Sequence, residues 1–144
     1  MGPFRTMQTD FLDAHERHWD DAERLHQAER WANADHLYGM AAECGLKRLM
    51  RHFNMPWDTA NDRPVERQDR THVNVIWSRF EAYRGGHVDG AGYALSALNS
   101  FQDWQAEQRY AHQSNFDRPR ALAHQRGANE VRGLVKRAQK DGLI

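Results

Sequence analysis

Side chains that could bind a phosphate or move a proton gather between residues 109 and 124. The members of this group are Arg109, Tyr110, His112, Asn115, Arg118, Arg120 and His124. A guanidinium group donates paired hydrogen bonds to phosphate oxygens, and an imidazole can exchange a proton near neutral pH. Cleavage of a phosphodiester without a metal requires a base, an acid and a cation. The segment therefore predicts a site for a phosphate-containing ligand.

The spacing of these residues gives three pairs of an arginine with a histidine. Five residues separate Arg118 from His124, which places them about 120° apart around a helix, so they converge only if the first turn is distorted. Arg120 and His124 share a helix face, and so do Arg109 and His112. We predict catalytic roles for Arg118, His124, Arg109 and His112, and substrate-binding roles for Tyr110, Asn115 and Arg120.

Two of these candidates also have a purely structural interpretation. His124 lies on the same helix face as three apolar residues further along the chain, a pattern that also suits a packed, hydrogen-bonded core histidine. Arg109 could cap the end of a short helix or pair with Asp103 or Glu107. The sequence leaves both interpretations open.

The known sequence patterns of metal and cofactor sites are missing from this chain. Glu23 and His26 have the Glu-x-x-His spacing of a di-iron bundle, but no second copy exists to complete such a site. His15 and His18 share a helix face that we expect to be solvated. The single cysteine, Cys44, has apolar neighbours and is expected in the core. Because a glycine-rich phosphate loop is also missing, we expect neither a metal nor a cofactor.

Length and charge limit the class of protein. The 144 residues suffice for one domain with its own core, and 20 basic residues balance 20 acidic ones. A strong overall positive field for long nucleic acids is therefore excluded, although a local basic patch is not. No apolar run approaches the roughly 20 residues of a membrane span, and the N-terminus lacks the apolar core of a secretory signal. We expect a cytoplasmic protein with no membrane contact.

The most informative pattern is a pair of adjoining helices in the first third of the chain. The first is predicted from residue 10 or 13 to residue 31, the second covers 34–52, and the polar segment 33–35 separates them. The second helix is apolar on most of its faces, which is typical of a helix buried among others. Glu43 and Lys47 interrupt it at a spacing that favours an ion pair.

Further helices are expected in the rest of the chain, and no segment has the pattern of a strand. The expected segments are a loop over 54–70, a helix over 73–83, a short helix over 100–110 and a last helix from 117 to 141. The sequence thus predicts an all-α, antiparallel up-and-down bundle of four main helices plus one short helix. Residues 1–12 are expected to form an N-terminal extension, and residues 13–144 a single domain.

The first helical pair resembles the opening hairpin of HEPN domains (higher eukaryotes and prokaryotes nucleotide-binding). Members of that family carry an Asp-Ala-Glu-like start, a small-residue hinge and an Ala-Ala-Glu-x-x-Leu-Lys helix. The matching residues here are Asp21-Ala22-Glu23, Trp31-Ala32-Asn33-Ala34 and Ala41-Ala42-Glu43 with Leu46-Lys47. His72, and Trp104 followed by Arg109-Tyr110, are also similar to HEPN features. The resemblance extends from about Asp13 to Ala138.

The resemblance implies a helical bundle that forms a homodimer. Many HEPN members are metal-independent endoribonucleases or toxins of toxin–antitoxin pairs, and these use an Arg-x4–6-His motif duplicated across the dimer cleft. Others bind RNA, nucleotides or partner proteins without catalysis. We therefore expect an RNA- or nucleotide-interacting protein, with ribonuclease activity as its catalytic form. The alternative is a noncatalytic helical module for a partner protein encoded nearby, with Trp57 as one candidate for its surface.

Overall fold

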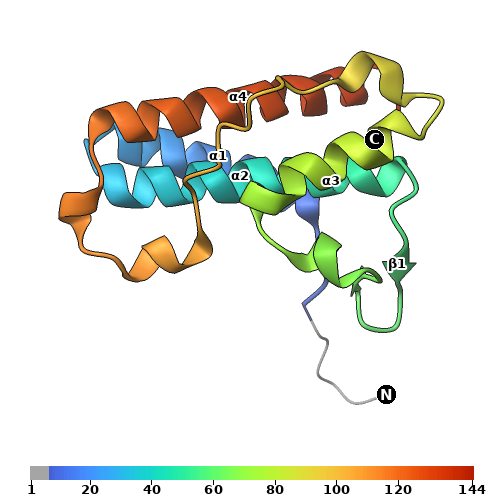
Figure 1. Ribbon diagram of the computed structural model, residues 1–144, viewed down its shortest axis with the longest axis horizontal. Coiled ribbons are helices and arrows are strands. Elements are labelled where there is room, and N and C mark those ends of the chain that lie inside the picture. The colour runs from blue at the N-terminus through green and yellow to red at the C-terminus, as the bar shows by residue number, and fades with distance from the viewer. Residues whose placement is uncertain (1–6) are drawn as a thin grey trace.

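A helical hairpin formed by α1 (Phe11–Gln27) and α2 (Trp31–His52) organises the computed structural model, which describes residues 7–144 (Figure 1). The side chain of Asp10 caps α1 by accepting a hydrogen bond from the backbone of Asp13. The chain reverses at residues 28–30, where Glu29 adopts the left-handed conformation with φ of 58°. The hairpin confirms the predicted pair of helices, but the predicted break at 33–35 is wrong, because α2 runs through these residues without interruption.

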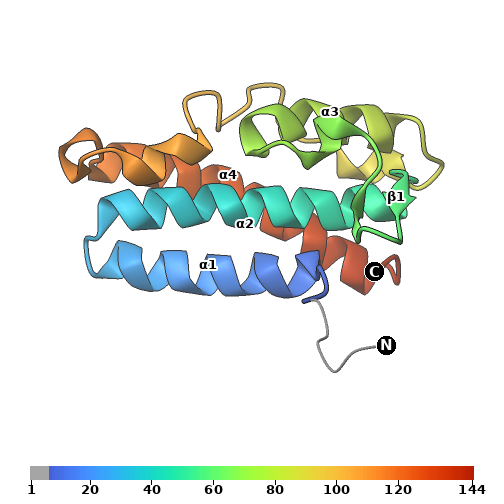
Figure 2. The ribbon, with the colours of Figure 1, turned by 90° about the horizontal axis from the view of Figure 1, so that it is seen from below.

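Helix α2 is the centre of the bundle, as its apolar composition predicts. Most of its side chains are buried, and α1, α3 (Val73–Gly85) and α4 (Arg118–Lys140) all pack against it (Figure 2). The Glu43–Lys47 ion pair forms, with 3.1 Å between the carboxylate and the ammonium group. An all-α bundle of four long helices is therefore confirmed.

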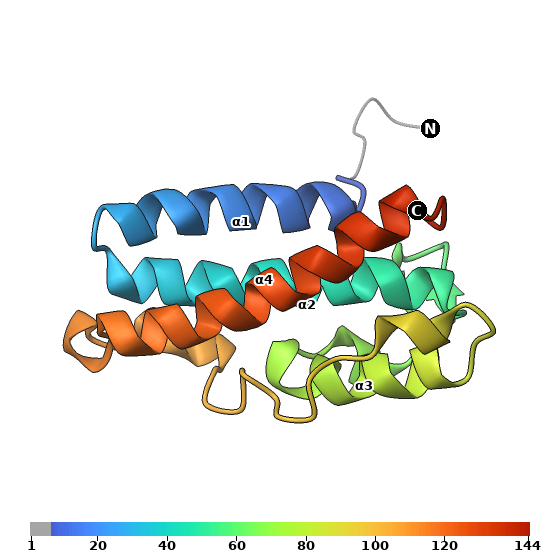
Figure 3. The same ribbon diagram turned by 90° about the horizontal axis from the view of Figure 1, so that it is seen from above.

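The direction of the helices differs from the prediction. Asp35, near the start of α2, contacts His124, near the start of α4, and Phe53, just after α2, packs on Phe80 late in α3. Helices α2, α3 and α4 thus run the same way, and only α1 runs against them (Figure 3). The up-and-down order is wrong because two long connections, 53–72 and 86–117, carry the chain back along the bundle.

The first connection contains a small β-ladder that the sequence analysis did not predict. Strand β1 (Trp57–Asp58) pairs antiparallel with β2 (Arg63–Pro64), and a 3₁₀ turn, η1 (Arg67–Arg70), follows. Trp57 packs edge-on against Phe11 and lies under the guanidinium of Arg51, 4.0 Å from the ring centre. Trp57 therefore covers an edge of the core.

The second connection is an extended strap between α3 and α4 (Figure 3). It contains three 3₁₀ turns, η2 (Gly90–Tyr93), η3 (Ala106–Tyr110) and η4 (Gln113–Asn115). The helix expected over 100–110 is thus limited to η3, although Phe101 and Trp104 are buried as predicted. The indole of Trp104 lies on Gly39 of α2, where a Cβ atom would overlap the ring.

Three further predictions concern His15, Cys44 and membrane-spanning helices. His15, expected on a solvated face, is fully buried, and its Nδ1 lies 2.7 Å from the carbonyl oxygen of Ala41, because α1 packs this face against α2. Cys44 is buried, as predicted. Among residues 7–144, no helix has both the length and the apolar character needed to cross a membrane.

Candidate functional site

His124 lies at the centre of a buried charge network. Its side chain is 1% exposed, with Nδ1 at 2.6 Å from Asp35 Oδ2 and Nε2 at 2.8 Å from Asp103 Oδ1. Carboxylates only accept hydrogen bonds, so both nitrogens donate and the ring is an imidazolium. Burial alone would lower the pKa of His124, but the two carboxylates outweigh it and raise this pKa above its ordinary value. In this conformation His124 has no nitrogen free to act as a base.

Arg120 belongs to the same network. Its guanidinium donates to the Asp103 carboxylate at 3.1 Å and to the Asp103 carbonyl oxygen at 2.7 Å. Asp35, which is fully buried, also accepts a hydrogen bond from Gln108. The network therefore joins α2, the strap and α4. This arrangement agrees with the structural interpretation of His124 as a packed, hydrogen-bonded core histidine. Arg120, predicted to bind substrate, is instead occupied with Asp35 and Asp103.

An open groove of about 480 Å³ lies beside this network, where the strap passes the start of α2. It is lined by Glu29, Arg30, Trp31, Ala32, Asn33, Gln108, Arg109, Ala111, His112, Gln113, Ser114 and Phe116. The first turn of α2 forms one wall, and it has neither a side-chain cap nor an acidic residue. Its backbone N–H groups carry partial positive charge, and the lining side chains include two positive charges, Arg30 and Arg109, against the one negative charge of Glu29. The groove therefore favours an anion.

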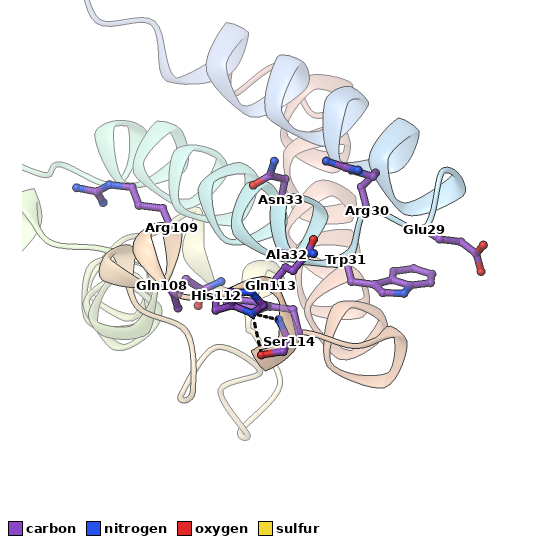
Figure 4. A pocket seen from close by; sticks show the side chains of 12 residues that line it. Glu29, Arg30, Trp31, Ala32, Asn33, Gln108, Arg109, His112, Gln113 and Ser114 are labelled. Carbon is purple, nitrogen blue, oxygen red and sulfur yellow. Dashed lines mark hydrogen bonds between the residues drawn. The ribbon is translucent and has the colours of Figure 1, made fainter.

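Two of the predicted site residues, Arg109 and His112, line this groove, but they do not contact each other (Figure 4). His112 Nδ1 accepts the Ser114 backbone N–H at 3.1 Å, so Nε2 carries the hydrogen of a neutral ring. Arg109 points away from His112. Its guanidinium donates to the Ala106 carbonyl oxygen at 2.8 Å and lies 4.6 Å from the Tyr110 ring centre. Arg109 thus binds the first residue of its own 3₁₀ turn rather than capping the end of that turn.

The other predicted residues do not themselves line the groove. Arg118 lines a separate shallow pocket with His26 and Trp31, so it does not converge on the buried His124. Tyr110 is 78% exposed. The Asn115 side chain donates to the His112 carbonyl oxygen and holds the turn that presents this histidine.

A pair of histidines that the sequence analysis did not assign lies around Trp104. His36 stacks on the indole with 5.4 Å between ring centres, and His72 lies 6.2 Å from the same ring. His36 follows the groove residue Asn33 by one turn of α2, although His36 itself is not among the residues that line the groove. Arg109, which also lines the groove, is close enough for its charge to act on His36.

The environments of these two histidines shift their pKa values in opposite directions. The hydrogen bond between His72 Nδ1 and Glu43, 2.9 Å long, raises the pKa of His72 despite partial burial. Burial lowers the pKa of His36, and the positive charge of Arg109 lowers it further. Relative to a free imidazole, these shifts favour the neutral form of His36 and the protonated form of His72, which are the forms of a base and an acid.

The residues that the sequence analysis missed lie at the start of α2 and around Trp104. Placing the hinge at 33–35 took Asn33 and Asp35 out of the helix and left the start of α2 unrecognised, together with Arg30. His36 and Trp104 are 68 residues apart in the sequence, and no local period connects them. The sequence signal that could have located this surface is the helical spacing of Trp31, Ala34 and Tyr38, which extends the apolar pattern of α2 back to Trp31.

Comparison of this chain with protein-family models, with curated proteins and with solved structures found no match. The function is therefore argued from the residues of the chain and their arrangement.

Proposed function

We propose that this protein is an RNA- or nucleotide-binding domain of HEPN type that holds phosphate in the groove at the start of α2. The observation that carries the proposal is the uncapped first turn of α2, which shares one groove with Arg30, Arg109 and His112. Backbone N–H groups at a helix start and guanidinium groups are the donors that proteins use for phosphate. The resemblance of the hairpin to HEPN domains supports the same substrate class.

The parallel direction of the helices strengthens the field at this end of the bundle. Helices α2 and α4 both begin here, so their positive dipole ends point the same way (Figure 3). Asp117 caps α4 and offsets part of its contribution. Helix α2 has no such acidic cap, so the favourable field is concentrated on its side of the groove.

Binding of a labelled single-stranded RNA over a range of salt concentrations tests this proposal. We expect affinity to fall steeply with salt, and Arg30→Ala and Arg109→Ala each to weaken binding and to make the salt slope shallower by about 0.7. Lys136→Ala removes an exposed charge from α4 outside the groove and serves as the matched control. Salt-insensitive binding, or an equal loss in the control, would contradict a phosphate site in the groove.

The catalytic form of this proposal is metal-independent RNA cleavage. In it, neutral His36 takes the proton of a ribose 2′-hydroxyl, the 2′-oxygen attacks the phosphorus, and protonated His72 gives its proton to the departing 5′-oxygen. Arg109 neutralises the charge that develops on the phosphate oxygens. The opposite pKa shifts of the two histidines favour this pair. His112, with its Nε2–H in the groove, is the competing candidate from the sequence.

Cleavage assays in the presence of EDTA separate these candidates. We expect His36→Ala and His72→Ala to abolish cleavage while RNA binding persists, and His112→Ala to keep at least part of the rate. Loss of cleavage in His112→Ala alone would move the chemistry into the groove. No cleavage by the wild-type protein, together with salt-dependent binding, would leave the domain as a noncatalytic RNA-binding module.

The resemblance also predicts a homodimer with a second groove across its two-fold axis. Light scattering measures the mass, and mixing inactive Arg109→Ala and His36→Ala proteins tests whether subunits share a site. Recovery of cleavage in the mixture is expected only if one subunit completes the site of the other. For the alternative function, a partner-binding module, Trp57 stays a candidate surface residue, because it packs on Phe11 and Arg51 but is only partly buried.

A further inference from the structure

Three side chains with metal-binding atoms meet at the end of the bundle opposite the groove. His52 is the last residue of α2, and His87 and Asp89 lie in the turn after α3. Their candidate ligand atoms all lie within 4.8 Å of one another. His52 Nε2 is 2.9 Å from Asp89 Oδ2, and His87 Nδ1 is 3.8 Å from the same oxygen. Within residues 7–144 no other group of histidine, cysteine or acidic residues has this arrangement.

These distances fit a tetrahedral ion after small shifts of the side chains. Zinc–nitrogen and zinc–oxygen bonds of about 2.1 Å place neighbouring tetrahedral ligand atoms roughly 3.4 Å apart. The two distances to Asp89 lie on either side of that value. His87 Nδ1 accepts the Asp89 backbone N–H at 3.0 Å, so this nitrogen already carries the lone pair that a metal needs. Metal binding would exchange that hydrogen bond for coordination.

The surroundings of the three residues suit a cation. Because α2 and α3 are parallel, both end here, and their negative dipole ends point toward the cluster (Figure 1). The rings of His52 and His87 pack on Phe53, each at 5.4 Å between ring centres, which shields one side from water. Two nearby arginines are directed elsewhere, with Arg51 over the Trp57 ring and Arg84 on Glu81, while Arg48 lines a pocket together with His52.

We propose that His52, His87 and Asp89 form a binding site for a divalent transition metal such as Zn²⁺. Two imidazoles and one carboxylate select zinc-like ions over Mg²⁺ or Ca²⁺, which require oxygen ligands. Three protein ligands leave a fourth position for water. The site joins the end of α2 to the turn after α3, so the bound ion would fasten the first residues of the long strap. This inference is independent of the proposed RNA function.

Metal titration of the full chain without a polyhistidine tag tests the site. We expect calorimetry with Zn²⁺ to show one equivalent bound, Co²⁺ to give the intense visible absorption of tetrahedral coordination, and Zn²⁺ to raise the melting temperature. His87→Ala and Asp89→Asn should each weaken Zn²⁺ binding by more than about tenfold and remove the rise in melting temperature. His112→Ala, which removes an exposed histidine at the other end of the bundle, should change neither.

The variants His87→Ala and Asp89→Asn also distinguish a specific metal site from binding to scattered histidines. His87 and Asp89 lie in a surface turn, so circular dichroism is expected to show unchanged helix content in both variants. Equal Zn²⁺ affinity in the wild type and in His87→Ala would mean that the ion binds scattered histidines, and the site would be rejected. No binding at all would reduce the cluster to a His52–Asp89 hydrogen bond and would equally overturn the inference.

Discussion

His124 and Asp35 are 89 residues apart in the chain, yet Nδ1 of one lies 2.6 Å from Oδ2 of the other, and both side chains are buried. The contact joins the second turns of α2 and α4, which is consistent with the parallel direction of the two helices. Gln108 donates to the same Asp35 and also lines the groove, which connects the buried pair to the candidate binding surface. The buried network therefore helps to fix the position of Gln108, which forms part of the groove wall.

Replacing His124 by alanine is expected to lower the free energy of unfolding by about 3 kcal/mol, because Asp35 stays charged and buried without its main partner. Gln108 and Arg120 still contact Asp35, which keeps the loss at the lower end of the usual range. Urea denaturation at pH 7 measures the effect. Lys136→Ala, at an exposed position of α4, should change stability by less than about 0.5 kcal/mol. Loss of RNA cleavage in His124→Ala at unchanged stability would instead support the catalytic role predicted from the sequence.

The stability of the protein should depend on pH through His124 in a defined direction. The native state raises the pKa of His124, because Asp35 and Asp103 outweigh the effect of burial, so the native state holds its proton more tightly than the unfolded chain. This contribution is complete below the ordinary value of 6.5 and is lost as pH rises through the folded-state pKa. Urea denaturation of His124→Gln should therefore show a smaller fall in stability above pH 6.5 than the wild type.

His15 should make the stability of the protein depend on pH in the opposite direction. Burial lowers its pKa, so the native state keeps the ring neutral while the unfolded chain takes up a proton below about 6.5. The stability due to His15 is therefore lost as pH falls through this range. The acid side of the stability profile should be flatter in His15→Gln than in the wild type. An identical profile on the acid side would show that other groups, such as Asp103, account for acid sensitivity.

Alanine substitutions at Gly39 and Gly133 should have opposite effects on stability. A Cβ at residue 39 would overlap the buried Trp104 indole, so Gly39→Ala is expected to destabilise the protein by about 3 kcal/mol and to shift the tryptophan fluorescence. Residue 133 lies in α4 with open space around its Cα atom, and Gly133→Ala should stabilise by about 0.5–1 kcal/mol. Thermal and urea denaturation measure both changes. A neutral Gly39→Ala would mean that the strap does not pack here.

The sequence predicted the helices better than their connections. Apolar periodicity located α2, α3 and α4, and the Glu43–Lys47 spacing predicted their ion pair. The break between α1 and α2 was misplaced because Asp35 looks like a loop residue, whereas His124, 89 residues away, neutralises it inside the core. Polar residues mark a loop only where no distant partner satisfies them.

The candidate site was predicted only in part, for a related reason. Arg109 and His112 could be found because they belong to one dense local run of donors. The direction of α4 relative to α2 depends on a 32-residue connection that contains only short 3₁₀ helices and no α-helix, and local patterns do not encode its path. The surface formed by His36, His72 and Trp104 depends on that path, since the strap places Trp104 between segments far apart in the sequence.

If the protein cleaves RNA, the rate should have a bell-shaped pH profile with limbs on either side of 6.5. The rate rises as His36 loses its proton, at a pKa that burial and Arg109 lower, and falls as His72 loses its proton, at a pKa that Glu43 raises. Glu43→Gln removes that carboxylate, so the alkaline limb should move to lower pH while the acid limb stays in place. Single-turnover rates in EDTA from about pH 5 to about pH 9 measure both limbs, with circular dichroism at each pH as the folding control. Lys47 pairs with Glu43 and its charge lowers the pKa of His72, so Lys47→Met should move the alkaline limb the other way, to higher pH. An alkaline limb that stays fixed in Glu43→Gln would exclude His72 as the acid.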